Sequence, residues 1–255
     1  MTGMSTLSAT RRLHTYANPA RFMALSAGLL PPLWVLSGVL LVAGLWFALV
    51  ASPPDYQQSE TVRIMYVHVP SAWLAMFGYS VMAVASAVAL VFRHPLADVC
   101  ARSAAPIGAA FTFLSLVSGS LWGRPMWGTW WEWDARLTSV LILFFLYLGY
   151  IALWATIEEP IRAARAAAVL ALAGAVNIPI IHYSVNWWNT LHQPASVFRM
   201  DGPTVAPSML LPLMLMALAF TVIFVTLLLV RMRAEILRRR VRTLRLAQAA
   251  SIGGV

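Results

Sequence analysis

The sequence contains no lysine, and all of its 18 basic residues are arginines. A P-loop needs a lysine on the nucleotide phosphates and a Schiff-base enzyme needs a lysine amine, so both classes are excluded. The single cysteine, Cys100, excludes an internal disulfide and a C-x-x-C-H motif for covalent cofactor attachment. Charged residues are also scarce, at 11% of 255 residues. This is not the composition of a soluble domain.

Long apolar runs take up most of the chain. Hydrophobic residues make up 60% of the sequence, and the mean hydropathy is +0.75. Six runs reach the roughly 17 to 25 residues needed to cross a bilayer, and they lie near 30–50, 71–92, 104–122, 139–156, 164–182 and 206–230. We therefore expect an all-α polytopic membrane protein with six transmembrane helices. Its membrane domain would span 30–230, between an N-terminal arm (1–29) and a basic tail (231–255).

The arginines are distributed unevenly over the connections between these runs. The two terminal segments and the turns at 93–103 and 157–165 hold 14 of them, whereas the other three connections hold four. Arginine-rich connections face the cytoplasm, so both termini are expected there, with outer loops at 51–70, 122–138 and 183–205. This topology accounts for the net charge of +9, and no nucleic-acid partner is expected. The tail is most simply a helix on membrane lipid, with docking of a cytoplasmic partner as the alternative.

Tryptophans gather in or beside the outer loops, which hold eight of the eleven. Five lie in or beside the second loop: Trp122, Trp127, Trp130, Trp131 and Trp133. An aromatic belt should appear at both membrane interfaces. The asymmetry therefore favours a platform for a flat ligand over a simple membrane anchor.

Two histidines lie on the loops that flank this platform. His68, in YVHVPSAW, comes just before the expected start of the second helix, and His192 lies in WWNTLHQ. One surface histidine is usually solvated, but two that a bundle can bring together suit the axial positions of a flat metal macrocycle. Haem fits because its porphyrin stacks on indoles, its iron accepts imidazole and its propionates pair with cations.

Other polar residues of the outer side have secondary expected roles. The cations available to propionates are Arg63, Arg124 and Arg136. Asp134 is expected to cap the fourth helix or organise the loop, and its pairing with Arg136 stays open. His182, at the end of the fifth run, is a third ligand candidate at a position where histidine is commonly structural. His14 and His94 fall on the cytoplasmic side.

The stretch WGTWWEWD at 127–134 resembles the tryptophan-rich WWD signature of haem-handling proteins in cytochrome c biogenesis. With HVPSAW before it, WWNTLHQ after it and six helices, the chain is similar to the CcmC family over about 60 to 230. The resemblance implies a bacterial inner-membrane protein that holds non-covalent haem b at the periplasmic face and delivers it to the haem chaperone CcmE. It also implies that His68 and His192 are the axial ligands and that 127–134 forms a haem-facing shelf.

The same resemblance implies association with the ABC-type subunits CcmA and CcmB and with the small protein CcmD. ATP hydrolysis is expected on partner subunits, in agreement with the missing P-loop lysine, and the chain itself is not expected to be an enzyme. Two alternatives stay open: a pore-forming subunit of a haem exporter and a membrane oxidoreductase that oxidises quinol. The cores of the six runs lack ionisable side chains, which argues against proton-coupled transport, but haem is itself largely apolar.

Overall fold

The computed structural model describes residues 18–193, 196–197 and 199–253. Arg11, Arg12 and His14 of the expected N-terminal arm lie outside this range. Within it the chain is helical almost throughout, and the β-structure is limited to an isolated bridge between Asp55 and Ser59. Six helical segments are long and apolar enough to cross a membrane. The expected fold class is confirmed.

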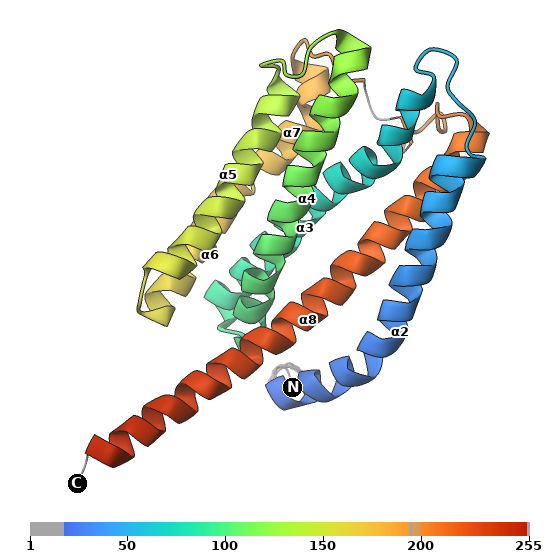
Figure 1. Cartoon of the computed structure of the whole chain (residues 1–255). Helices are drawn as coiled ribbons and strands as arrows, with labels where there is room; N and C mark the ends of the chain where they lie inside the picture. Colours follow the sequence, from blue (N-terminus) through green and yellow to red (C-terminus); the bar gives the residue numbers. More distant parts are fainter. Residues whose placement is uncertain (1–17, 194–195, 198, 254–255) are drawn as a thin grey trace, which may run out of the picture.

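The six spans follow one another along the chain as shown in Figure 1. The first is α2 (Pro19–Trp46), which continues into a π-helical turn, η1 (Phe47–Ala51). The second is a 3-10 turn, η2 (Glu60–Ile64), followed directly by α3 (Met65–Phe92). The other four are α4 (Pro95–Trp127), α5 (Ala135–Thr156), the pair α6 (Pro160–Gly174) and α7 (Asn177–Trp187), and α8 (Pro207–Gly253).

Helices α3 and α4 pack against each other at the centre of the bundle, with α5, α6 and α7 on one side and α2 and α8 on the other (Figure 1). The centre is filled by large buried side chains, among them Tyr79 and Tyr147, whose rings meet edge to face at 5.0 Å. The Tyr147 hydroxyl donates a hydrogen bond of 2.9 Å to the Ala75 carbonyl. That ring lies where a Cβ at position 108 would be, so α4 needs Gly108 there.

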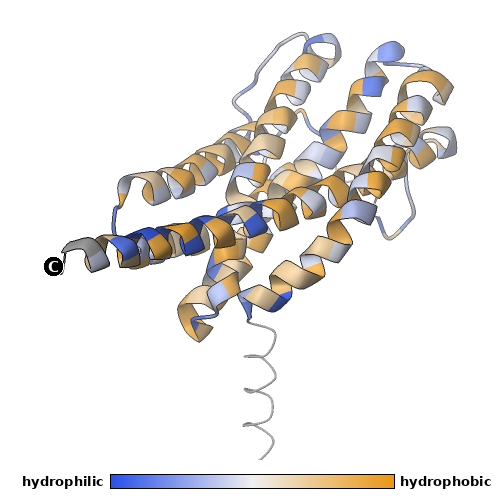
Figure 2. Ribbon diagram, turned by 60° about the horizontal axis from the view of Figure 1, so that its bottom comes forward, coloured by the Kyte–Doolittle hydropathy of each residue, from blue (hydrophilic) through white to orange (hydrophobic). Residues whose placement is uncertain are grey.

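Hydrophobic residues make up most of the helical ribbon, whereas hydrophilic residues gather on the C-terminal part of α8 (Figure 2). Val39, for example, is 61% exposed and Val84 is 64% exposed. Exposed apolar surface on this scale is costly in water and ordinary in lipid. The surface therefore agrees with a multi-pass membrane protein.

Several helices extend beyond the apolar runs. Helix α2 begins at Pro19 instead of near 30, because Asn18 caps it by accepting a 2.8 Å hydrogen bond from the Ala20 N–H. Helix α3 begins at Met65, so His68 lies in its first turn and not in the preceding loop. The basic tail is a continuation of α8 up to Gly253. Apolarity marks the part of a helix that lies in lipid, while caps and prolines set where it begins.

The fifth span is broken near its middle, between Gly174 and Asn177. Pro179 has no N–H for the carbonyl of Ala175, and its ring crowds that carbonyl, which explains the interruption. The Asn177 amide donates a 2.8 Å hydrogen bond to the Ser139 carbonyl of α5. This bond fixes α7 against the start of α5. The loop that carries His192 follows α7.

Candidate functional site

His68 is held by α4 through one nitrogen of its ring. Its Nδ1 lies 3.1 Å from the Ser115 carbonyl oxygen and 3.1 Å from Ser118 Oγ. A carbonyl only accepts, and the Ser118 hydroxyl already donates to the Leu114 carbonyl at 2.6 Å, so Nδ1 is the donor to both. Nε2 therefore keeps its lone pair, which is the state required of a metal ligand.

Close approach of α3 and α4 makes this contact possible. A Cβ built on Gly119 would come within 2.9 Å of His68 Cε1. Trp122, one turn further along α4, meets the imidazole edge to face, with ring centroids 5.7 Å apart. The indole N–H of Trp122 donates to Gln58 Oε1 at 2.9 Å. Small residues at 115, 118 and 119 thus form the surface on which the His68 ring lies.

His192 is held in the same way by a carboxylate. Its Nδ1 lies 3.3 Å from Asp134 Oδ2, and the same oxygen accepts a 2.5 Å hydrogen bond from the Thr190 hydroxyl. The other oxygen, Oδ1, accepts from the Leu137 N–H at 2.7 Å and so caps α5. Asp134 therefore ties the tryptophan loop to the third outer loop, and the two segments lie side by side at the top of Figure 1.

The ionisation of this pair suits a neutral ligand. Burial lowers the pKa of His192 below its ordinary value, and the Asp134 carboxylate offsets this only in part. Burial opposes ionisation of Asp134, but hydrogen bonds from Thr190 and the Leu137 N–H keep the pKa of its carboxyl below the ordinary value. At neutral pH His192 is thus uncharged, donates Nδ1–H to an ionised Asp134, and leaves Nε2 free.

The two histidines belong to one site. Both rings lie beside the C-terminal turns of α4, which carry their tryptophan partners. Trp127 meets the His192 ring edge to face with centroids 4.9 Å apart. Two tryptophans of the C-terminal turns of α4 therefore contact one histidine each: Trp122 contacts His68, and Trp127 contacts His192. We call the part of the molecule that carries these residues the histidine end of the bundle.

The remaining tryptophans of the second loop are more open. Trp130 is 55% exposed and Trp133 is 73% exposed, whereas Trp131 is partly buried and its Nε1 has no hydrogen-bond partner among the described residues. Trp131 and Trp133 meet edge to face at 5.5 Å. An open cavity of about 540 Å³ lies beside them, lined by Trp133, Asp134, Ala135, Thr138, Trp188 and Asn189. Indole surfaces from two loops thus border one hollow.

The three expected propionate partners already bind protein groups. Arg63 pairs with Glu60 and donates to the Ala48 carbonyl at 3.1 Å, which ties the first loop to η1 at the end of the first span. Arg124 donates to the Gly128 carbonyl. Arg136 donates to the Ile181 and His182 carbonyls of α7, each at 3.2 Å, and no ion pair joins it to Asp134 among the described residues. Arg136 is therefore a brace between α5 and α7.

The other histidines lie apart from this arrangement. His182 is exposed on α7, where its ring meets Tyr183 edge to face at 4.7 Å. His94 occupies the N-cap position of α4, at the opposite end of the bundle, without a capping hydrogen bond from its side chain to any described residue. The residues that sequence analysis missed are the partners of the ligand candidates: Ser115, Ser118, Gly119 and Thr190. A row of small residues on one face of 104–122 was the available signal for the first three.

Comparison with known proteins gives matches along nearly the whole chain. A family model described as Heme exporter protein C (CcmC) matches residues 12–247. The Heme exporter protein C of Bradyrhizobium diazoefficiens is 64% identical, over 92% of this chain and 89% of the relative. That of Haemophilus influenzae is 49% identical over 89% and 92%, and that of Escherichia coli K12 is 48% identical over 89% and 91%. Both histidines and the tryptophan loop fall within the region matched by the family model, and the chain belongs to the CcmC family.

Proposed function

We propose that the chain handles haem for cytochrome c maturation, holding it between His68 and His192 at one face of the membrane. The observation that carries this proposal is the matched arrangement of the two imidazoles. Each has Nδ1 committed to a fixed acceptor, a backbone carbonyl for His68 and a carboxylate for His192. Each therefore presents Nε2 as a lone-pair donor. The Heme exporter protein C name of the relatives agrees with haem as the cargo.

The tryptophans supply the apolar surroundings that a porphyrin needs. Trp122 and Trp127 contact the two imidazoles, Trp133 lines the cavity, and Trp130 is an exposed ring of the same loop. Haem b held only by neutral imidazoles and stacking is bound without a covalent bond and can leave again. A chain that passes haem on requires such reversible binding.

Arg136 has a double role in this proposal. Its guanidinium holds the α7 carbonyls, and its positive charge also acts on both histidines. It is therefore near enough to attract a propionate without leaving its structural position. Arg124 is exposed at the end of α4 and is the more accessible cation. Arg63, tied to Glu60 and to the end of α2, contributes mainly to the position of the first loop.

We further propose that the histidine end faces the periplasm and that the chain lies in the bacterial inner membrane. Arg93, Arg162 and the basic tail of α8 all lie at the opposite end, as expected for a cytoplasmic side. CcmE would receive haem at the histidine end, with CcmD and the ABC-type subunits CcmA and CcmB as further partners. ATP hydrolysis would occur on those subunits, so this chain is a haem-binding component and not an enzyme.

A receiver of haem is favoured over a conduit by the packing of the bundle. The space between α3, α4 and α5 is filled by Tyr79, Leu143 and Tyr147, all fully buried. Opening a path for a porphyrin through this packed core would require α4 and α5 to separate. The exporter alternative would therefore require haem to pass at an interface between this chain and CcmB.

The proposed delivery is tested with purified components. Haem-loaded protein in lipid nanodiscs is mixed with apo-CcmE, and the haem that elutes with CcmE is measured over time. The proposal predicts transfer from the unaltered protein and loss of most of it with His192→Ala. His182→Ala is the matched control because His182 is an exposed histidine of the same face, and it should transfer normally. Equal transfer from all three proteins would rule out His192 as part of the delivery site.

A further inference from the structure

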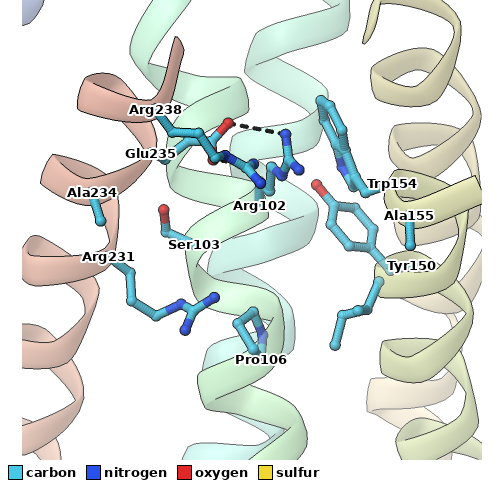
Figure 3. Close-up of a pocket in the computed structure, with 11 residues that line it drawn as sticks. Arg102, Ser103, Pro106, Tyr150, Trp154, Ala155, Arg231, Ala234, Glu235 and Arg238 are labelled. Atoms are coloured by element: carbon cyan, nitrogen blue, oxygen red, sulfur yellow. Dashed lines mark hydrogen bonds and ion pairs between the residues drawn. The ribbon is translucent and has the colours of Figure 1, made fainter. Parts of the chain in front are cut away.

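A second cavity lies at the end of the bundle opposite the histidines. It has a volume of about 610 Å³ and is bordered by α4, α5 and α8. Figure 3 shows α8 and α5 as its two walls, with α4 behind. It is therefore a groove between α5 and α8 with α4 behind it, and none of its lining residues belongs to the proposed haem site.

The upper part of this groove holds an ion-pair network in which three arginines share two acids, so a positive charge remains in excess. Arg102 of α4 binds Glu235 of α8 at 3.0 Å, as drawn in Figure 3, and lies over the Trp154 ring at 4.2 Å. Arg239 bridges Glu235 at 2.8 Å and Asp98 at 2.7 Å. The buried Glu235 is thus compensated by neighbouring arginines.

Arg231 is different from these arginines. It lies one turn nearer to the middle of α8 than Glu235, about 6 Å along the helix. Its side chain extends across the groove toward Pro106 in Figure 3. Among the residues that the structure describes, it has neither an ion pair nor a hydrogen bond from its guanidinium. The residue is exposed, so its guanidinium is available to an anion that enters the groove.

We propose that this groove binds an anionic phospholipid, with its phosphodiester on Arg231 and an acyl chain along the groove. Arg102, Arg231 and Arg238 line the groove against one acid, Glu235, so its charge is complementary to a phosphate. Beside Arg231, at the deeper end of the groove, the lining includes the apolar Pro106 and Ile151. A cation beside apolar lining suits a lipid whose phosphate binds the cation and whose acyl chain packs on the apolar residues.

The test is lipid binding measured by native mass spectrometry on the detergent-purified full chain. Phosphatidylglycerol and the zwitterionic phosphatidylcholine are titrated in parallel. The unaltered protein should retain phosphatidylglycerol preferentially, and Arg231→Gln should weaken that binding about tenfold, the effect of losing one hydrogen-bonded charge. Arg242→Gln is the matched control, because Arg242 is an exposed arginine of the same helix outside the groove, and it should bind as the unaltered protein does.

Further arms separate this site from other anions and from the haem site. A photoreactive phosphatidylglycerol should crosslink to peptides of α4, α5 and α8, and His68→Ala should leave its binding unchanged. Equal binding by the unaltered protein and Arg231→Gln would overturn the proposal. Equal affinity for phosphatidylcholine, or complete displacement of phosphatidylglycerol by millimolar inorganic phosphate, would also overturn it. A third contradictory result is that haem displaces phosphatidylglycerol from the unaltered protein but not from Arg231→Gln. Because the Arg231 guanidinium makes no hydrogen bond or ion pair with the described residues, the variant should keep its helical content and thermal stability.

Discussion

His192 and Asp134, 58 residues apart in the sequence, are joined by a 3.3 Å contact between Nδ1 and Oδ2. The same carboxylate caps α5 through the Leu137 N–H. Asp134 therefore links the position of His192 to the start of α5. In the proposed haem site this makes Asp134 a positioning residue that acts on the iron through His192.

Asp134→Asn should weaken haem binding by about 10- to 100-fold, as is usual when the carboxylate partner of a metal-bound histidine is removed. The amide is the same size and still caps α5 through its oxygen, so insertion and helical content should be kept. Haem titration followed by the Soret band measures the loss. Glu132→Gln is the control, because Glu132 is an exposed acid of the same loop. Unchanged affinity in Asp134→Asn would show that the contact does not support ligation.

Haem binding through His192 should be insensitive to pH above about 6.5 and should fall at more acid pH. The pKa of His192 is lowered by burial, so its imidazole is neutral at pH 7 and a proton competes with iron only below the ordinary value. The measurement uses the His68→Ala background, in which His192 is the remaining axial ligand. Asp134 raises the pKa of His192, so adding Asp134→Asn should move the acid loss to lower pH. A purely structural role for Asp134 would leave that midpoint where it was.

Gly119→Ala should displace His68 and remove its ligation. The new methyl group would come 2.9 Å from His68 Cε1, closer than carbon atoms pack. Overpacking of this kind costs about 1 to 3 kcal/mol, which the ring can relieve by leaving its contacts with Ser115 and Ser118. The six-coordinate spectrum should become five-coordinate. Gly38→Ala, where a Cβ meets nothing within 4 Å, should leave the spectrum unaltered.

The tryptophans should separate into two groups. Trp122→Ala and Trp127→Ala remove rings that contact the histidines, so they should change the absorption and electron paramagnetic resonance spectra of bound haem. The double variant Trp130→Ala and Trp131→Ala should instead lower haem occupancy while the spectrum of the remaining haem and membrane insertion stay the same. If that double variant bound haem with normal occupancy, the second loop would be reduced to an interfacial anchor.

Hydropathy alone predicts the six spans, because each apolar stretch is longer than a bilayer is thick. It does not predict their ends. Asn18 and Pro19 start α2 early through local capping, and Met65 opens α3 before His68 because helix formation continues through polar residues. The break at Gly174 could be suspected from Pro179. The close contact of Gly174 with Tyr79, in contrast, depends on how two helices pack.

The sequence singles out the ligand candidates, but it does not predict the residues that hold them in place. His68, His192 and the tryptophans stand out because polar or aromatic residues are conspicuous beside apolar runs. The Nδ1 partners, Ser115 and Asp134, are fixed by contacts between segments about 50 residues apart, and no local pattern encodes such pairs. Arg136 illustrates the limit most clearly, because its sequence neighbour Asp134 suggested an ion pair, whereas its guanidinium binds carbonyls of α7.

Axial ligation of bound haem tests the central claim most directly. Purified protein loaded with haem b should give the low-spin electron paramagnetic resonance and absorption spectra of a bis-histidine complex. His68→Ala and His192→Ala should each give a spectrum with one histidine lost, and His182→Ala should match the unaltered protein. If His68→Ala and His192→Ala both kept an unchanged six-coordinate spectrum, these two residues would not be the ligands of the iron.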